Sequence, residues 1–306
     1  MDLNPTIADL ELLAPWFLPM TAFLFGSIVG SFLNVVIYRI PAGKSIVSPG
    51  SQCACGQPIK WHHNIPILSW ILLRGKASCC GQPYSVRYPA VEALTALLFL
   101  FTWLTLSPLA ALGGMAFVSL LVAATFIDLD HMIIPDSISI GGTVFAVVIS
   151  FLVPAIHGYA QADFFILGSI KSGIASIIGV FTGSGLILWI ALVAEAVLRK
   201  EAMGFGDVKL MGLIGGFLGW QGALFTVFGG AIVGTLWFIF ALLLRVLFRK
   251  GAPKLLPAES PEGEVVDAGF GAHVPFGPML AIAAALYLLI AKPYFEAYLQ
   301  TILAIW

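Results

Sequence analysis

Three aspartates stand within eleven residues in the stretch FIDLDHMIIPD, which ends a long apolar run. A fourth, Asp207, stands in the glycine-containing stretch MGFGDVKL beside another apolar run. An ionised carboxylate near hydrocarbon is costly, so each of these side chains needs a partner or a chemical role. Two carboxylates within hydrogen-bonding distance share a proton, so one can accept a proton from water while the other donates one to a carbonyl oxygen. That is the chemistry of aspartic proteases.

Asp128 and Asp207 are the best candidates for such a pair. Asp128 is the first polar residue after its apolar run and is expected to lie deepest, where a span ends. Around Asp207, Gly204 and Gly206 allow the backbone to leave the helix and to approach another chain closely. Irregular backbone at membrane depth occurs only where it lines a cavity or is covered by protein. Lys209 either biases the local electric field or anchors the helix end, and we favour the anchor.

The other acids beside apolar runs have structural interpretations. Asp136 follows a proline and opens an apolar run, which is the position of a helix N-cap. Asp130 is expected to pair with His131 or to face water. Glu92 and Glu195 stand near basic residues, so we expect them to be paired or solvated at the membrane interface.

Membrane helices must position these side chains. The chain has 306 residues, of which 59% are hydrophobic and 10% charged, and the apolar residues come in long blocks. At about 20 residues per span, we expect an all-α polytopic membrane protein with about eight transmembrane helices. Two of the blocks hold two helices each, separated at Ser107-Pro108 and near 219–222. The uncharged blocks cover residues 16–38, 93–127, 137–156, 172–194, 210–244 and 277–291.

The positions of the basic residues predict the orientation. With the N-terminus outside, all Lys and Arg except Lys171 and Lys292 belong to the cytoplasmic side, which agrees with the positive-inside rule. Asp128 and Asp207 then lie at cytoplasmic helix ends and can meet at one membrane face. The net charge is only −1, and the basic residues form no concentrated stripe, so we expect no nucleic-acid partner. The predicted cytoplasmic segments are 39–88, 128–136, 199–209 and 249–275.

The largest polar segment, 39–88, is predicted to be a cytoplasmic insert between the first two spans. It contains all the cysteines of the chain, namely Cys53, Cys55, Cys79 and Cys80. Two cysteine pairs separated by a loop suggest a tetrahedral zinc site, although neither pair has the usual C-x-x-C spacing. The alternative is four reduced cytosolic thiols. A third arrangement has His62 or His63 replacing one cysteine as a ligand.

Six separate strings resemble those of the prepilin peptidases, the bacterial type IV leader peptidases. In chain order they are GSFLNVVIYRIP, WHHNIPILSWILLRGKASCCGQP, RYPAVEALTALLF, FIDLDHMIIPD, GFGDVKLMG and PFGPMLA. The resemblance implies an aspartic endopeptidase of the bacterial cytoplasmic (inner) membrane, with catalytic aspartates that match Asp128 and Asp207. Such enzymes need no cofactor to cut the basic leader from type IV prepilins and pseudopilins, after a glycine, at the cytoplasmic face. They serve type IV pili and type II secretion.

The resemblance also implies a second activity and a division of the chain. Many members methylate the new N-terminal amine with S-adenosylmethionine. The insert of the family commonly has two C-x-x-C pairs, whereas here the first pair is Cys53-Ala54-Cys55 and Ala77 stands where a cysteine is expected. We expect an N-terminal segment with the first helix (1–38), the cysteine-containing insert (39–88) and a peptidase domain with seven helices (89–306).

Two other classes of function remain open from the residues alone. Paired interfacial carboxylates also suit a proton-coupled transporter, which predicts similar inverted halves, and none is evident in the sequence. A scaffold without enzymatic activity would leave the depth of Asp128 and the glycines beside Asp207 without explanation. In every interpretation the lipid bilayer is a partner.

Overall fold

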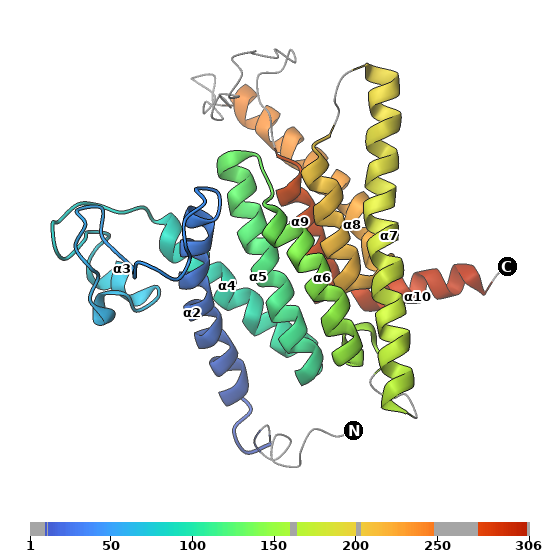
Figure 1. The fold of residues 1–306 in the computed structure, drawn as a ribbon, viewed down its shortest axis with the longest axis horizontal. Helices are drawn as coiled ribbons and strands as arrows, with labels where there is room; N and C mark the ends of the chain where they lie inside the picture. Colours follow the sequence, from blue (N-terminus) through green and yellow to red (C-terminus); the bar gives the residue numbers. More distant parts are fainter. Residues whose placement is uncertain (1–9, 11, 160–163, 200–202, 248–274, 305–306) are drawn as a thin grey trace.

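Figure 1 shows the computed structural model, which describes residues 10, 12–159, 164–199, 203–247 and 275–304. Within these ranges the regular structure is helical, apart from two isolated β-bridges in the segment that follows the first long helix. The α-helices are α2 (Phe17–Arg39), α3 (Leu68–Leu72), α4 (Arg87–Thr105), α5 (Pro108–His131), α6 (Asp136–Leu152), α7 (Phe165–Leu198), α8 (Phe205–Leu247), α9 (Gly277–Leu286) and α10 (Lys292–Leu303). Shorter turns are η1 (Trp61–His63), η2 (Pro154–His157) and the π-helical η3 (Tyr287–Ala291).

The prediction of an all-α polytopic membrane protein is confirmed. In the part of the chain that is described, 6 helical runs are long and apolar enough to cross a membrane: α2, α4, α5, α7, α8 and the run from α9 into α10. The apolar helix α6 is shorter. The predicted break at Ser107-Pro108 is also confirmed, since Ser107 is extended and Pro108 is the first residue of α5. Proline suits that position because the first helical residue has no backbone hydrogen bond to lose.

The predicted break near residue 219 is a reversal within α8. A straight helix of 43 residues would measure about 65 Å, twice the thickness of the hydrocarbon core. At Gly219 the backbone leaves helical geometry, with φ 71° and ψ −177°, which glycine tolerates. After the break, Gly222 lies against Tyr287 and Gly230 against Leu280. The second arm therefore runs back toward the start of α9, so α8 contributes two of the eight expected apolar segments.

The first arm of α8 lies at the centre of the bundle. Its residues Leu210, Met211, Leu213 and Ile214 are buried. It crosses α7 so closely that a Cβ at Gly179 or at Gly215 would collide with the other glycine's carbonyl group. Small residues allow such close backbone contact between membrane helices. This crossing fixes the position of α8, and Asp207 lies in the first turn of that helix.

The predicted insert between the first two spans is confirmed in position, because α2 ends at Arg39 and α4 begins at Arg87. The insert extends to one side of the bundle (Figure 1) and contains η1 and α3. The flanking helices pack closely, with Gly26 of α2 against Ala96 and Phe99, and Gly30 against Glu92. The insert therefore emerges from a rigid helix pair.

Some predicted features fall wholly or partly outside the described residues. Of the predicted cytoplasmic segments, residues 200–202 and 249–274 belong to this group, and so do Lys200, Arg249, Lys250 and Lys254. The last uncharged block, 277–291, forms only part of a longer helical run, since helical backbone continues from α9 through η3 into α10. Figure 1 shows that α10 turns away from the direction of the bundle.

Candidate active site

Asp128 lies in the last turn of α5, where only 5% of its surface is exposed. Helix α5 ends at His131, and the next residue, Met132, adopts a left-handed conformation and donates its N–H to the Asp128 carbonyl at 2.9 Å. Gly277, the first residue of α9, lies against the Asp128 carboxyl so closely that a Cβ there would collide with Oδ2. The start of α9 therefore forms one wall around this carboxyl group.

Asp207 lies in the first turn of α8, with 8% of its surface exposed. The helix begins one residue after Gly204, whose carbonyl accepts the Asp207 N–H at 3.1 Å. Gly206 packs against Ile134, and Ile134 also contacts Gly277 beside Asp128. Ile134 is therefore a common neighbour of the segments that carry or face the two aspartates. The structure thus brings together the two carboxylates that the sequence predicts as a pair.

One carboxyl oxygen of this pair has no hydrogen-bond partner among the described residues. This atom is Oδ2 of Asp128, which is buried beside Gly277. Buried polar atoms are normally satisfied, so an unpaired one is a candidate for binding water or substrate. A buried carboxyl pair with an open oxygen can activate a water molecule and protonate a carbonyl oxygen.

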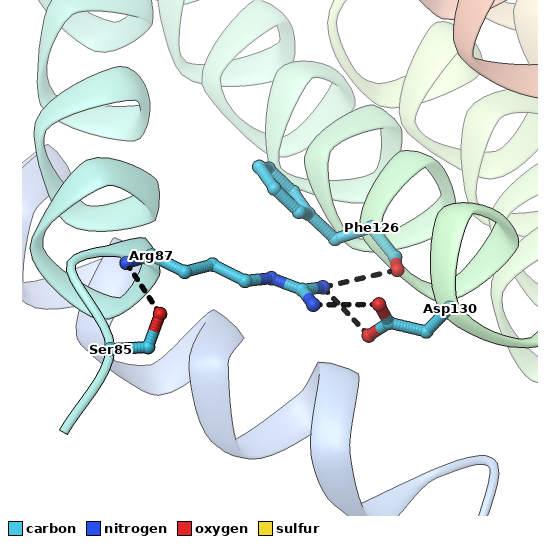
Figure 2. A network of polar contacts seen from close by, with 4 residues as sticks. All are labelled: Ser85, Arg87, Phe126 and Asp130. Atoms are coloured by element: carbon cyan, nitrogen blue, oxygen red, sulfur yellow. Dashed lines mark hydrogen bonds and ion pairs between the residues drawn. The ribbon is translucent and has the colours of Figure 1, made fainter. Parts of the chain in front are cut away.

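Asp130 has a partner that differs from the expected ones. The Arg87 guanidinium donates to both carboxylate oxygens of Asp130, at 2.6 and 2.7 Å, as Figure 2 shows. Its Nη2 also donates to the Phe126 carbonyl at 3.3 Å, and the guanidinium lies 5.0 Å from the centroid of the Phe126 ring. The expected partner His131 was wrong, because the partner, Arg87, is distant in sequence, whereas the exposure of Asp130 to water agrees with the other alternative. Asp130 joins the start of α4 to the end of α5.

Asp136 is not the N-cap of α6. Pro135 occupies the cap position, Asp136 is the first helical residue, and no side chain caps the helix by a hydrogen bond. Its carboxylate accepts from Lys209 Nζ at 2.6 Å, and a negative charge in the first turn suits the helix dipole. Lys209 is therefore an anchor between α8 and α6, as we favoured.

The chain is similar to known proteins over most of its length. Residues 24–106 match the bacterial peptidase A24 N-terminal domain, and residues 115–239 match the type IV leader peptidase family. A prepilin leader peptidase/N-methyltransferase of Aeromonas hydrophila is 34% identical over 302 residues, which cover 90% of this chain and 91% of that protein. The chain belongs to the type IV leader peptidase family.

Other relatives carry the same name. The prepilin leader peptidase/N-methyltransferase of Myxococcus xanthus is 38% identical over 224 residues, and the match covers 70% of this chain and 61% of that protein. The one from Neisseria gonorrhoeae is 30% identical over 303 residues, covering 90% and 92%. No solved structure matches the chain. The chain is thus a multi-pass membrane protein of this leader peptidase family.

In this family member the insert gathers its cysteines despite their unusual spacing. The four Sγ atoms lie within 4.8 Å of one another, with Cys53 and Cys80 3.6 Å apart and Cys55 and Cys79 3.4 Å apart. A tetrahedral Zn²⁺ with bonds of about 2.3 Å places its sulfur ligands about 3.8 Å apart. The cluster therefore fits a Cys₄ zinc site, for which each cysteine pair supplies two ligands from its own turn.

The two turns hold the thiols in place through backbone hydrogen bonds. Cys53 donates its N–H to the Gln57 carbonyl, and Ala77 donates to the Gln82 carbonyl, both at 2.8 Å. The Cys55 backbone N–H, followed by the Cys79 and Cys80 thiols, lowers the pKa of the Cys53 thiol to about 7, while the contact with Cys53 raises the pKa of the Cys79 thiol. A thiolate at neutral pH is the form that binds metal.

Neither histidine of the insert belongs to this cluster. His63 Nδ1 instead lies 2.8 Å from the Ser78 hydroxyl, next to Cys79. The predicted replacement of a cysteine by a histidine is therefore wrong for the described residues.

Glu92 was missed as a link between the insert and the bundle. It was expected at the interface, paired or solvated, but it is buried and accepts the Ile67 N–H at 2.7 Å. Ile67, just before α3, has φ 63°, which is a strained conformation for a β-branched residue. The available signal was helical spacing, because Glu92 shares a face of α4 with Thr95 and Phe99, which are also buried. Glu195 is exposed, as expected.

Proposed function

We propose that this protein is an aspartic endopeptidase that cleaves the basic leader from type IV prepilins and pseudopilins, after glycine, with Asp128 and Asp207 as its catalytic pair. One observation carries the proposal. Two aspartates far apart in sequence are buried where apolar helices end, and Ile134 contacts the glycine beside each of them. The names of the relatives support prepilins as the substrate class.

The pair acts with one carboxyl protonated and the other ionised. The ionised carboxylate takes a proton from water, whose oxygen bonds to the carbonyl carbon of the glycine, while the other carboxyl protonates the carbonyl oxygen. The C–N bond of the resulting diol then breaks. Its nitrogen takes the proton from the first carboxyl, and a hydroxyl returns a proton to the second. Both side chains end in their starting states, so the reaction needs no further reactant.

The position of the pair suits a substrate with a basic leader and an apolar segment. The distribution of Lys and Arg favours the cytoplasmic side for the helix ends that carry Asp128 and Asp207. We place the protein in the bacterial cytoplasmic membrane, where the apolar segment of the prepilin enters the bilayer and its leader stays in the cytosol. The cleavage site then reaches the membrane face at the two aspartates.

We also propose that the protein methylates the new N-terminal amine, because the names of its relatives include an N-methyltransferase. S-adenosylmethionine supplies the methyl group in such reactions. The described residues do not identify its site, because the buried hydroxyls without a hydrogen-bond partner are on α3, α7 and α8, with α3 and α7 at opposite sides of the molecule (Figure 1). We derive no step through this cofactor.

The four cysteines of the insert are proposed to hold one Zn²⁺. The support is the gathering of their sulfur atoms at tetrahedral spacing. Such a site would stabilise the insert, whose few apolar residues provide little core of their own. This metal takes no part in the proposed cleavage reaction, because the two aspartates alone carry out the proton transfers.

Purified protein, incubated with a prepilin in detergent or nanodiscs, tests the proposed cleavage. Asp128→Asn and Asp207→Asn are each expected to abolish it, because an amide cannot exchange the proton. Glu195→Gln, which changes an exposed acid at the end of α7, serves as the matched control and should cleave normally. Normal processing by either asparagine variant, inserted at the wild-type level, would show that the assignment is wrong.

A further inference from the structure

The two aspartates share an arrangement of neighbours that their roles in proton transfer do not explain. Each has a phenylalanine two residues before it and a charged residue two residues after it: Phe126-Ile127-Asp128-Leu129-Asp130 and Phe205-Gly206-Asp207-Val208-Lys209. In both stretches the charged residue forms an ion pair with another helix. In both, the cation of that pair lies over the ring of the phenylalanine.

The first of these groups, which we call the Asp128 clamp, consists of Arg87, Phe126 and Asp130 (Figure 2). Arg87 comes from the start of α4, and it binds the carboxylate of Asp130, the carbonyl of Phe126 and the face of the Phe126 ring. Its own backbone N–H donates to the Ser85 hydroxyl at 3.1 Å. One guanidinium thus holds the last turn of α5 at three points.

The second group, the Asp207 clamp, consists of Asp136, Phe205 and Lys209. Lys209 Nζ lies 2.6 Å from an Asp136 oxygen and 5.4 Å from the centroid of the Phe205 ring. Asp136 belongs to the first turn of α6, so this clamp holds the first turn of α8 against the neighbouring helix.

Helix geometry places each clamp on the side of the helix opposite to its aspartate. Residues four apart share a face, as Phe126 and Asp130 do, and so do Phe205 and Lys209. With 3.6 residues per turn, a residue midway between them points about 200° away. Burial agrees, because Asp128 and Asp207 are buried, whereas the Asp130 and Lys209 side chains are 32% and 27% exposed. The clamps therefore hold the helix without reaching the site.

We propose that the two clamps are positioning devices that set the separation of the two carboxylates, an inference that rests on the proposed function. Terminal turns lack part of their backbone hydrogen bonds and are the least fixed parts of a helix. A catalytic pair tolerates little displacement, since a misplacement of 1 Å costs about 100-fold in rate. Exposed ion pairs contribute little to stability, so stability alone gives no reason for two matched pairs at these two places.

Charge reversal tests this inference with a readout that a general structural role would not give. The single variants Arg87→Asp, Asp130→Arg, Lys209→Asp and Asp136→Lys are each expected to lower kcat for prepilin cleavage by about 10-fold to 100-fold. KM and the melting temperature should stay near their wild-type values. The doubles Arg87→Asp/Asp130→Arg and Lys209→Asp/Asp136→Lys should recover most of the lost kcat, because they restore the pair with its charges exchanged.

Lys44→Ala is the matched control. Lys44 also lies over an aromatic ring, that of Tyr38 at 5.3 Å, but far in sequence from either aspartate, so this variant should keep wild-type kcat. Where a reversal prevents folding, Phe126→Leu and Phe205→Leu replace it, and each should lower kcat in protein that melts normally.

The outcomes separate this inference from the proposed function. The proposed positioning role of the clamps would be overturned by wild-type kcat in the folded single variants. It would also be overturned if the double variants fold but recover none of the lost kcat. Cleavage by Asp128→Asn or Asp207→Asn would instead overturn the catalytic assignment, whatever the clamp variants do.

Discussion

Gly277 offers a way to move the Asp128 carboxyl without replacing either aspartate. A Cβ at this position would collide with Asp128 Oδ2 and would lie 3.3 Å from Ile134 Cδ1. To restore an ordinary contact, the carboxyl or the start of α9 must move by about 1 Å. A displacement of that size costs about 100-fold in rate, or about 2.7 kcal/mol of transition-state stabilisation.

We therefore expect Gly277→Ala to cleave prepilin about 100-fold more slowly at saturating substrate. The helix itself should not suffer, because alanine is a better helix former than glycine. Gly185→Ala, at a site in α7 where a Cβ meets nothing within 4 Å, is the control and should keep wild-type activity and melting temperature. Single-turnover cleavage measures the effect. A Gly277→Ala protein with wild-type kcat would refute the idea that α9 fixes the Asp128 carboxyl.

Three further predictions concern the rest of the molecule. Wild-type protein should contain one zinc per chain by metal analysis and Cys79→Ser much less, whereas His63→Ala should keep it; equal zinc in all three would count against the Cys₄ site. Gly179→Leu should lower the melting temperature in detergent and the yield of folded protein, because its side chain meets the Gly215 carbonyl; an unchanged melting temperature would contradict the α7–α8 crossing. The pH profile of kcat should be bell-shaped, since cleavage needs one carboxyl ionised and one protonated; a profile with a single limb would argue against paired catalysis.

Features that depend on composition and on local helix-start and helix-break residues were predicted well from the sequence. Long apolar blocks predicted the membrane helices, Pro108 predicted the start of α5, and Gly219 predicted the break within α8. Asp128 and Asp207 were singled out as candidates because a carboxylate at the end of an apolar run is energetically costly and needs a partner or a role. Their mutual approach followed from topology, since both motifs belong to helix ends on the same side of the predicted membrane.

The partners of the other acids were not predictable in the same way. Asp130 pairs with Arg87, and Asp136 with Lys209, across helices that are distant in sequence. Periodicity and helix-end signals describe one element at a time and contain no information on which side chain of another element comes within reach. The burial of Glu92 was visible only as helical spacing, and its partner, the Ile67 N–H, depends on how the insert folds.

The same reasoning explains why Asp207 needs two kinds of restraint. The glycine crossing at Gly179 and Gly215 fixes the middle of the first arm of α8, because the two backbones are too close for any side chain at either position. That crossing lies about two turns from Asp207, and the first turn of a helix has unpaired N–H groups. A rigid middle therefore does not define the position of the end, and the ion pair of Lys209 with Asp136 supplies the missing contact. The end of α5 that carries Asp128 is held in the same way by Arg87. The separation of the two carboxylates therefore depends on contacts from α4 and α6, although neither helix carries a catalytic aspartate.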